Sequence, residues 1–82
     1  MGILSMSGHQ VGLGLARSWA GRKGCSAAPE WDTGTLVLVV KQGDHGAELG
    51  RLPMGAWDGI PCVPLDRLAG ILEPLPDRHT GI

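Results

Sequence analysis

Histidine, cysteine and acidic side chains are the groups in this sequence most able to bind a metal ion. His9, His45 and His79 lie far apart, and no pair of residues has the spacing HxxxH or CxxC. Those spacings matter because they bring two ligands together on one helix or turn. We therefore expect no metal site and no other cofactor, and we interpret Asp44-His45 and Asp77-Arg78-His79 as solvated loop residues.

Nucleophilic catalysis would need a serine or cysteine beside a base and an orienting acid. The sequence has no GxSxG, and its glycine-rich stretch 8–14 matches neither GxGxxG nor a P-loop. Cys62 stands between two prolines, where only the start of a following helix would activate its thiol. Cys25 and Cys62 are expected to be reduced and to pack as small apolar side chains, with a disulfide between them as the alternative. These observations predict a protein that is not an enzyme.

One segment resembles a nuclease family. Glu30-Trp31-Asp32, an apolar strand ending in Val40-Lys41, a hairpin and a helix follow the core order of PD-(D/E)XK nucleases over roughly residues 30–73. That family has a metal-binding acid two residues before the lysine, and this sequence has Val39 there. The resemblance therefore implies at most a related fold without cleavage.

Basic residues are concentrated near Trp19. Arg17, Trp19, Arg22 and Lys23 combine three cations with an aromatic ring, which is the combination that holds a phosphate backbone and stacks on a base. The alternative is a solvated strand end with Trp19 in the core. Three charges bind phosphate only weakly, so a nucleic-acid-binding regulator is our second hypothesis.

Protein contact is the first hypothesis. Trp31 and Trp57 are expected on loops, and aromatic side chains displayed on loops are enriched at interface hot spots, although they also cap cores. Leu49 and Leu52 differ by three positions in an expected strand, so they point to opposite faces and only one can enter the core. We expect these four residues to contact a partner: Trp31, Leu49, Leu52 and Trp57. The function expected is that of a small non-catalytic accessory protein, which binds a different protein or a second copy of itself.

The length, net charge and apolar runs of the chain exclude several classes of protein. The chain has 82 residues and a formal net charge of −1, which excludes a strongly basic nucleic-acid protein and a polyanionic tail. Its longest apolar run is five residues, whereas a spanning helix needs about 20, so we expect a cytoplasmic protein without membrane contact. Residues 1–29 contain three basic and no acidic residues, and a targeting role for them stays an alternative.

The elements that position these residues form one small domain over residues 1–82, with loose ends at 1–8 and 77–82. Alternating apolar residues favour a strand over 9–19, because two interior glycines would cost a helix about 2 kcal/mol. A loop over 20–33, a buried strand over 33–41 and a returning strand over 47–52 follow. A loop over 53–59 precedes a strand over 60–63 that Pro61 restricts to a sheet edge. The helix is expected over 64–73. The fold class predicted is α+β, a small antiparallel sheet of three to four strands with one C-terminal helix.

Overall fold

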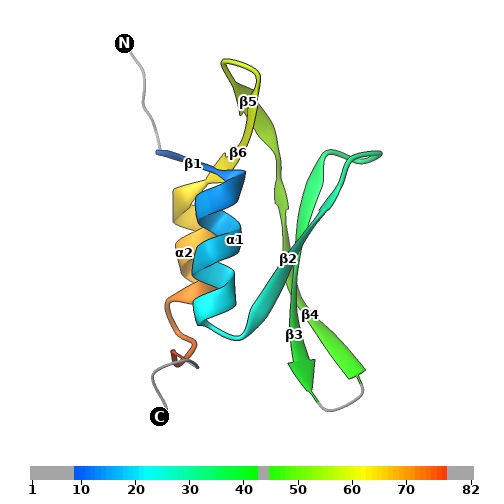
Figure 1. The fold of residues 1–82 in the computed structure, drawn as a ribbon, viewed down its shortest axis with the longest axis vertical. Helices are drawn as coiled ribbons and strands as arrows, with labels where there is room; N and C mark the ends of the chain where they lie inside the picture. The colour runs from blue at the N-terminus through cyan, green and yellow to red at the C-terminus, as the bar shows by residue number, and fades with distance from the viewer. Residues whose placement is uncertain (1–8, 43–44, 78–82) are drawn as a thin grey trace.

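A computed structural model describes residues 9–42 and 45–77, whose arrangement is drawn in Figure 1. In chain order its elements are β1 (Gln10–Gly12), α1 (Leu13–Arg22), β2 (Cys25–Glu30), β3 (Thr35–Gln42), β4 (His45–Pro53), β5 (Gly55–Trp57), β6 (Ile60–Pro64) and α2 (Leu65–Leu72). Two three-stranded antiparallel sheets and two helices make an α+β fold. The predicted α+β class is confirmed, and a C-terminal helix is present. The finer prediction is wrong, because two sheets with six strands and a second helix replace the single sheet of three to four strands and the one helix that we expected.

The larger sheet has the order β2-β3-β4 and is built around the apolar run that predicts a strand. β3 pairs with both neighbours, and β3 with β4 forms the predicted hairpin, whose residues 43 and 44 lie outside the described chain. Leu36 and Leu38 of β3 point to one face, where they join Leu52 of β4 in the hydrophobic core. The predicted buried strand is therefore the centre of this sheet.

Both helices lie side by side against the core (Figure 1). α2 contributes Leu68 and Leu72, which are fully buried, as the spacing of its apolar residues predicts. It begins directly after Pro64 and is followed by Pro74 and Pro76, so the predicted boundaries are close to the observed ones.

The strand predicted over residues 9–19 is wrong, because only Gln10–Gly12 is a strand and α1 follows at once. Ala16 and Ala20, four positions apart, are both fully buried, and their small side chains let the helix approach the core closely. Gly14 and Gly21 lie on the exposed side near the two ends. Burial of the alanine face outweighs the cost of about 1 kcal/mol that each glycine brings.

The loop predicted over residues 20–33 is also wrong, since it contains the end of α1 and all of β2. β2 alternates between buried and exposed side chains, with Cys25 and Ala27 in the core and Ser26 and Ala28 outside. This is the period of a strand with one buried face. The pattern is hard to recognise in the sequence because its buried members are small.

The smaller sheet has the order β1-β6-β5, so the prediction that Pro61 confines its strand to an edge is wrong. β1 pairs with β6 only from Cys62 to Pro64, and Pro61 pairs with β5 alone. The amide of Leu65 donates to the carbonyl oxygen of His9 at 2.8 Å. Every second residue of an antiparallel strand directs its backbone nitrogen to the same side, so the nitrogens of Val63 and Pro61 also point toward the β1 side of β6. β1 does not extend as far as Pro61, so the proline, which has no N–H, costs the sheet no hydrogen bond.

None of the helices within residues 9–42 and 45–77 has the length and apolar character needed to cross a membrane.

Candidate protein-binding site

An apolar hollow of about 370 Å³ lies between the turn that joins β2 to β3 and the hairpin formed by β5 and β6. Both turns are at the same end of the molecule in Figure 1. The hollow is open to solvent and is lined by Trp31, Gly34, Met54, Gly55, Ala56, Gly59 and Pro61. Met54 also packs against the hydrophobic core, so the hollow continues the core to the surface.

The turn after β2 fixes the position of Trp31. The carbonyl oxygen of Glu30 accepts hydrogen bonds from the amides of Thr33, at 3.3 Å, and Gly34, at 2.9 Å. Gly34 has a φ of +67°, a left-handed conformation that glycine adopts without strain. Its carbonyl oxygen in turn accepts a hydrogen bond from the amide of Met54 at 2.8 Å. Trp31 is thereby held beside the start of β5 while its side chain stays 64% exposed.

The segment 53–59, predicted as a loop, instead contains β5 and the tight turn of a second hairpin. Asp58 and Gly59 have φ values of +55° and +81°, as a two-residue turn of type I′ requires. This turn pairs Trp57 with Ile60 at the tip of the hairpin. Both side chains are mostly exposed, at 74% and 60%. An Asp-Gly pair between apolar residues is a strong hairpin signal in a sequence, and it could have found this element.

The hairpin presents apolar groups on both faces. Successive side chains of a strand point to opposite faces, so Ala56 and Pro61 face the hollow while Trp57 and Ile60 face the other way. Together with the neighbouring turn they make an apolar region that extends over both faces of the hairpin, in which Met54 and Pro61 are partly buried and the other residues are exposed. We call it the hairpin surface and define it by Trp31, Met54, Ala56, Trp57, Ile60 and Pro61.

Each of the two turns beside the hollow carries an acidic residue. Asp32 follows Trp31 in one turn, Asp58 follows Trp57 in the other, and both are exposed. The ion pairs found among residues 9–42 and 45–77 join Lys23 to Asp77 and Arg51 to Glu30 and Glu48. Neither aspartate takes part in them, so each of the two turns beside the hollow carries a negative charge outside these ion pairs.

The structure separates the two leucines that we expected at a partner contact. Leu52 is 1% exposed and belongs to the core. The prediction that it contacts a partner is therefore wrong, because a buried side chain is not accessible to one. Leu49 is 36% exposed. The pairing register between β3 and β4 shifts at this residue: Val39 pairs with Glu48, and Leu38 pairs with Gly50. Leu49 is therefore the extra residue of a β-bulge. Leu49 lies on β4, outside the lining of the hollow.

The basic residues near Trp19 differ in their surroundings. The Nζ of Lys23 donates to the carbonyl oxygen of Leu75 at 2.8 Å and pairs with Asp77 Oδ1 at 2.8 Å, and this side chain is only 13% exposed. Trp19 packs against the core. Arg17 and Arg22 remain as exposed cations of α1. Of the three cations in the predicted nucleic-acid site, Lys23 is therefore engaged within the protein, where it connects the end of α1 to the segment after α2.

The ion pair between Lys23 and Asp77 also fixes one residue of the C-terminal segment that we expected to be loose, residues 77–82. Asp77, which we expected to be loose, is held by Lys23, whereas residues 1–8 and 78–82 lie outside the described chain. Of the histidines, His9 and His45 are exposed, and His79 lies beyond the described residues. Within that part of the chain no three His, Cys, Asp or Glu side chains gather as a metal site would require. Cys25 and Cys62 are both buried.

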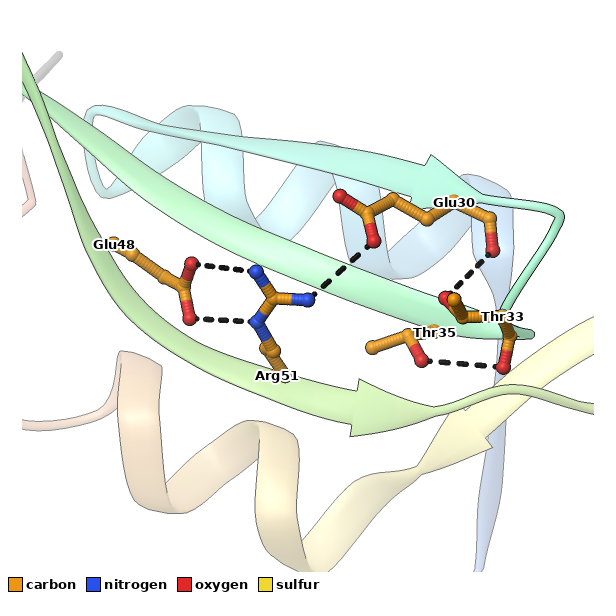
Figure 2. A network of polar contacts seen from close by, with 5 residues as sticks. All are labelled: Glu30, Thr33, Thr35, Glu48 and Arg51. Carbon is orange, nitrogen blue, oxygen red and sulfur yellow. Dashed lines mark hydrogen bonds and ion pairs between the residues drawn. The ribbon is translucent and has the colours of Figure 1, made fainter.

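A polar network covers the outer face of the larger sheet (Figure 2). Arg51 donates from Nε to Glu48 Oε2 at 2.8 Å and from Nη2 to Glu48 Oε1 at 3.1 Å, and its Nη1 lies 3.4 Å from Glu30 Oε1. Arg51 is also the register partner of Val37, so its aliphatic stem lies beside that valine, which is 6% exposed. The network therefore shields an apolar residue as well as pairing charges.

This network makes stability depend on pH. The hydrogen bond from Arg51 holds the pKa of Glu48 below its usual value, so the folded state favours the ionised carboxylate. The resulting stability is present above the unfolded pKa and is lost as the pH falls through the lowered folded pKa. We expect Arg51→Met to lower the thermal midpoint slightly at neutral pH and less near pH 3. Lys41→Met, an exposed cation on β3, is the control, and an equal pH dependence in both variants would contradict the assignment.

No protein-family model matches this chain, and no curated protein or solved structure shows significant similarity to it.

Proposed function

We propose that this chain is a small non-catalytic binding protein that contacts another protein through the hairpin surface. The observation that carries the proposal is the exposure of two tryptophans on adjacent turns beside an apolar hollow. Trp57 and Ile60 are paired at the tip of the hairpin, and Trp31 lines the hollow on its other side. Burying such a group in a partner is favourable, because tryptophan offers a large apolar area together with a polar N–H.

The way the surface is held supports a binding role. The Trp31 turn is closed by backbone hydrogen bonds and is joined to β5 through the bond between Met54 and Gly34. The type I′ turn fixes the tip of the hairpin in the same manner. A backbone that is already fixed loses less entropy on binding than a mobile one, so two turns held in this way support tighter binding than flexible loops with the same side chains.

The partner is a different protein or a second copy of this chain. Nucleic-acid binding through α1 is not favoured, because Lys23 is engaged and Arg17 and Arg22 leave only two exposed cations there.

Two variants and a matched control test the proposal. Trp31→Ala and Trp57→Ala remove exposed rings from the two turns. Leu15→Ala removes an equally exposed apolar side chain from α1, where Leu15 is 71% exposed. Sedimentation at tens of micromolar measures self-association, and affinity capture from cells that make the protein measures binding to other proteins.

We expect self-association or a captured protein to depend on both tryptophans and to survive Leu15→Ala. A wild type that is monomeric, and whose captured proteins are the same for all three variants, would refute the proposed function.

A further inference from the structure

The edge of β5 next to the hollow is unoccupied by any strand of the described chain. The antiparallel ladder between β3 and β4 reaches Thr35 and Pro53, and the bond from the Met54 amide to the Gly34 carbonyl oxygen extends it by one step. The chain then turns at Gly34, and β5 continues with β6 on one side only. The sheet order places β5 at an edge.

Backbone alternation identifies the residue that this edge exposes. Residues two apart in a strand direct their N–H groups to the same side, so Ala56 points its amide the way Met54 does, toward the Trp31 turn. In a hairpin with a two-residue turn, the pair that flanks the turn is hydrogen-bonded, and here that pair is Trp57 with Ile60. Hydrogen-bonded and non-hydrogen-bonded pairs alternate along an antiparallel ladder, so the next pair, Ala56 with Pro61, is not hydrogen-bonded. Both the N–H and the C=O of Ala56 therefore face the free edge.

This edge opens onto the hollow. The side chain of Ala56 lines the hollow together with Trp31 from the facing turn and Met54 from its inner side. Unpaired backbone groups at the edge of a sheet are the groups that an added strand binds, and pockets beside the edge accept alternate side chains of that strand. The arrangement matches an extended segment better than a helix, because the backbone groups in the interior of a helix are already bonded to one another and cannot pair along Ala56.

The rim adds a preference for charge. Asp32 and Asp58 are the charged residues of the two turns beside the hollow, and both are exposed. Neither is in an ion pair found in the described chain. A segment with basic side chains on either side of an apolar one would place its charges near the two aspartates.

We propose that the partner segment is an extended peptide, apolar at its centre and basic on both sides, which adds as a strand along β5. Its central side chain enters the hollow against Trp31, and its backbone exchanges two hydrogen bonds with Ala56. This inference rests on the proposed function and names the chemistry of the partner at the same surface.

The peptide acetyl-Lys-Ala-Leu-Ala-Lys-amide is a direct probe, because its leucine and both lysines share one face of an extended strand. Two control peptides separate the contributions. One replaces both lysines by glutamate, and the other carries an N-methyl group on the leucine, which removes the N–H that would bond to the Ala56 carbonyl. Binding is followed by tryptophan fluorescence and by calorimetry.

We expect saturable binding of the lysine peptide, with each control roughly three- to tenfold weaker. Ala56→Pro deletes the backbone donor without removing a bond of the hairpin, and Trp31→Ala deletes a wall of the hollow, so both should weaken binding similarly. Leu15→Ala should leave it unchanged. Should Ala56→Pro fail to fold, the N-methyl peptide tests the same hydrogen-bonded edge on the wild-type protein.

Absence of saturable binding, or equal binding of all three peptides, would overturn the inference. Self-association of the wild type that Ala56→Pro abolishes, without peptide binding, would also overturn it, because the edge would then take a second copy. Any of these results leaves the proposed function intact if partner capture still depends on Trp57. Capture that is indifferent to both tryptophans refutes the proposed function itself.

Discussion

Leu38→Asp is expected to leave the chain unfolded. Leu38 is fully buried in the central strand of the larger sheet, where it pairs with Ala27 on one side and Gly50 on the other. A carboxylate at this position has no cation to pair with in the core, and burying it costs several kcal/mol. A domain of this size has a free energy of unfolding of about 5–10 kcal/mol. Circular dichroism and the dispersion of amide proton shifts measure the loss of structure.

The matched control is Leu15→Asp. It makes the same chemical change at an exposed position in the first turn of α1, where a negative charge is favourable near the helix N-terminus. The control should fold as the wild type does. A soluble Leu38→Asp protein with the wild-type thermal midpoint would show that the core is assigned wrongly.

Lys23→Met is expected to lower the free energy of unfolding by about 1–3 kcal/mol. The ammonium group donates to the Leu75 carbonyl oxygen and pairs with Asp77, and both contacts are 2.8 Å long. They connect the end of α1 to the segment after α2, so their loss frees that segment as well as removing a charged hydrogen bond. Methionine keeps the apolar stem, so the difference reports the ammonium group. Urea unfolding monitored by circular dichroism measures it.

Arg22→Met is the control for this substitution, since it removes the preceding cation, which is exposed at the last residue of α1. It should change stability by less than about 0.5 kcal/mol. Equal effects of the two substitutions would contradict a special role for Lys23.

The elements that could be predicted from the sequence are those with a strong local signal. The run 35–40 of β-branched residues and leucines predicts a buried strand, and Pro64 before an amphipathic stretch with Pro74 after it predicts α2. These elements depend on apolar residues that are large enough to reveal their periodicity. The hairpin between β3 and β4 follows from the turn residues after the strand.

The elements that were missed depend on small residues and on distant contacts. α1 buries Ala16 and Ala20, and β2 buries Cys25 and Ala27, so neither shows a clear apolar pattern. Their stability comes from packing against the rest of the core, which overrides the cost of the helix glycines. The hairpin of β5 and β6 was missed although Asp58-Gly59 indicates it.

The candidate site was predictable only in part. Trp31 and Trp57 could be named as exposed aromatic residues on loops, but the hollow between their turns exists because Gly34 bonds to Met54, 20 positions further along. The basic residues show the opposite outcome. Lys23 was expected to be free for a ligand, and its partner Leu75 is 52 positions away. Local sequence contains no sign of either contact.

Site-specific photo-crosslinking tests most directly whether the hairpin surface is where this protein meets its partner. A benzophenone amino acid is introduced in place of Trp31, Trp57 or Leu15 in the full chain, in cells that make the protein, and the adducts are identified after irradiation. The account predicts a covalent protein adduct, with a different protein or a second copy, from positions 31 and 57 and none from position 15. Adducts from position 15 alone, or from none of the three positions, would contradict it.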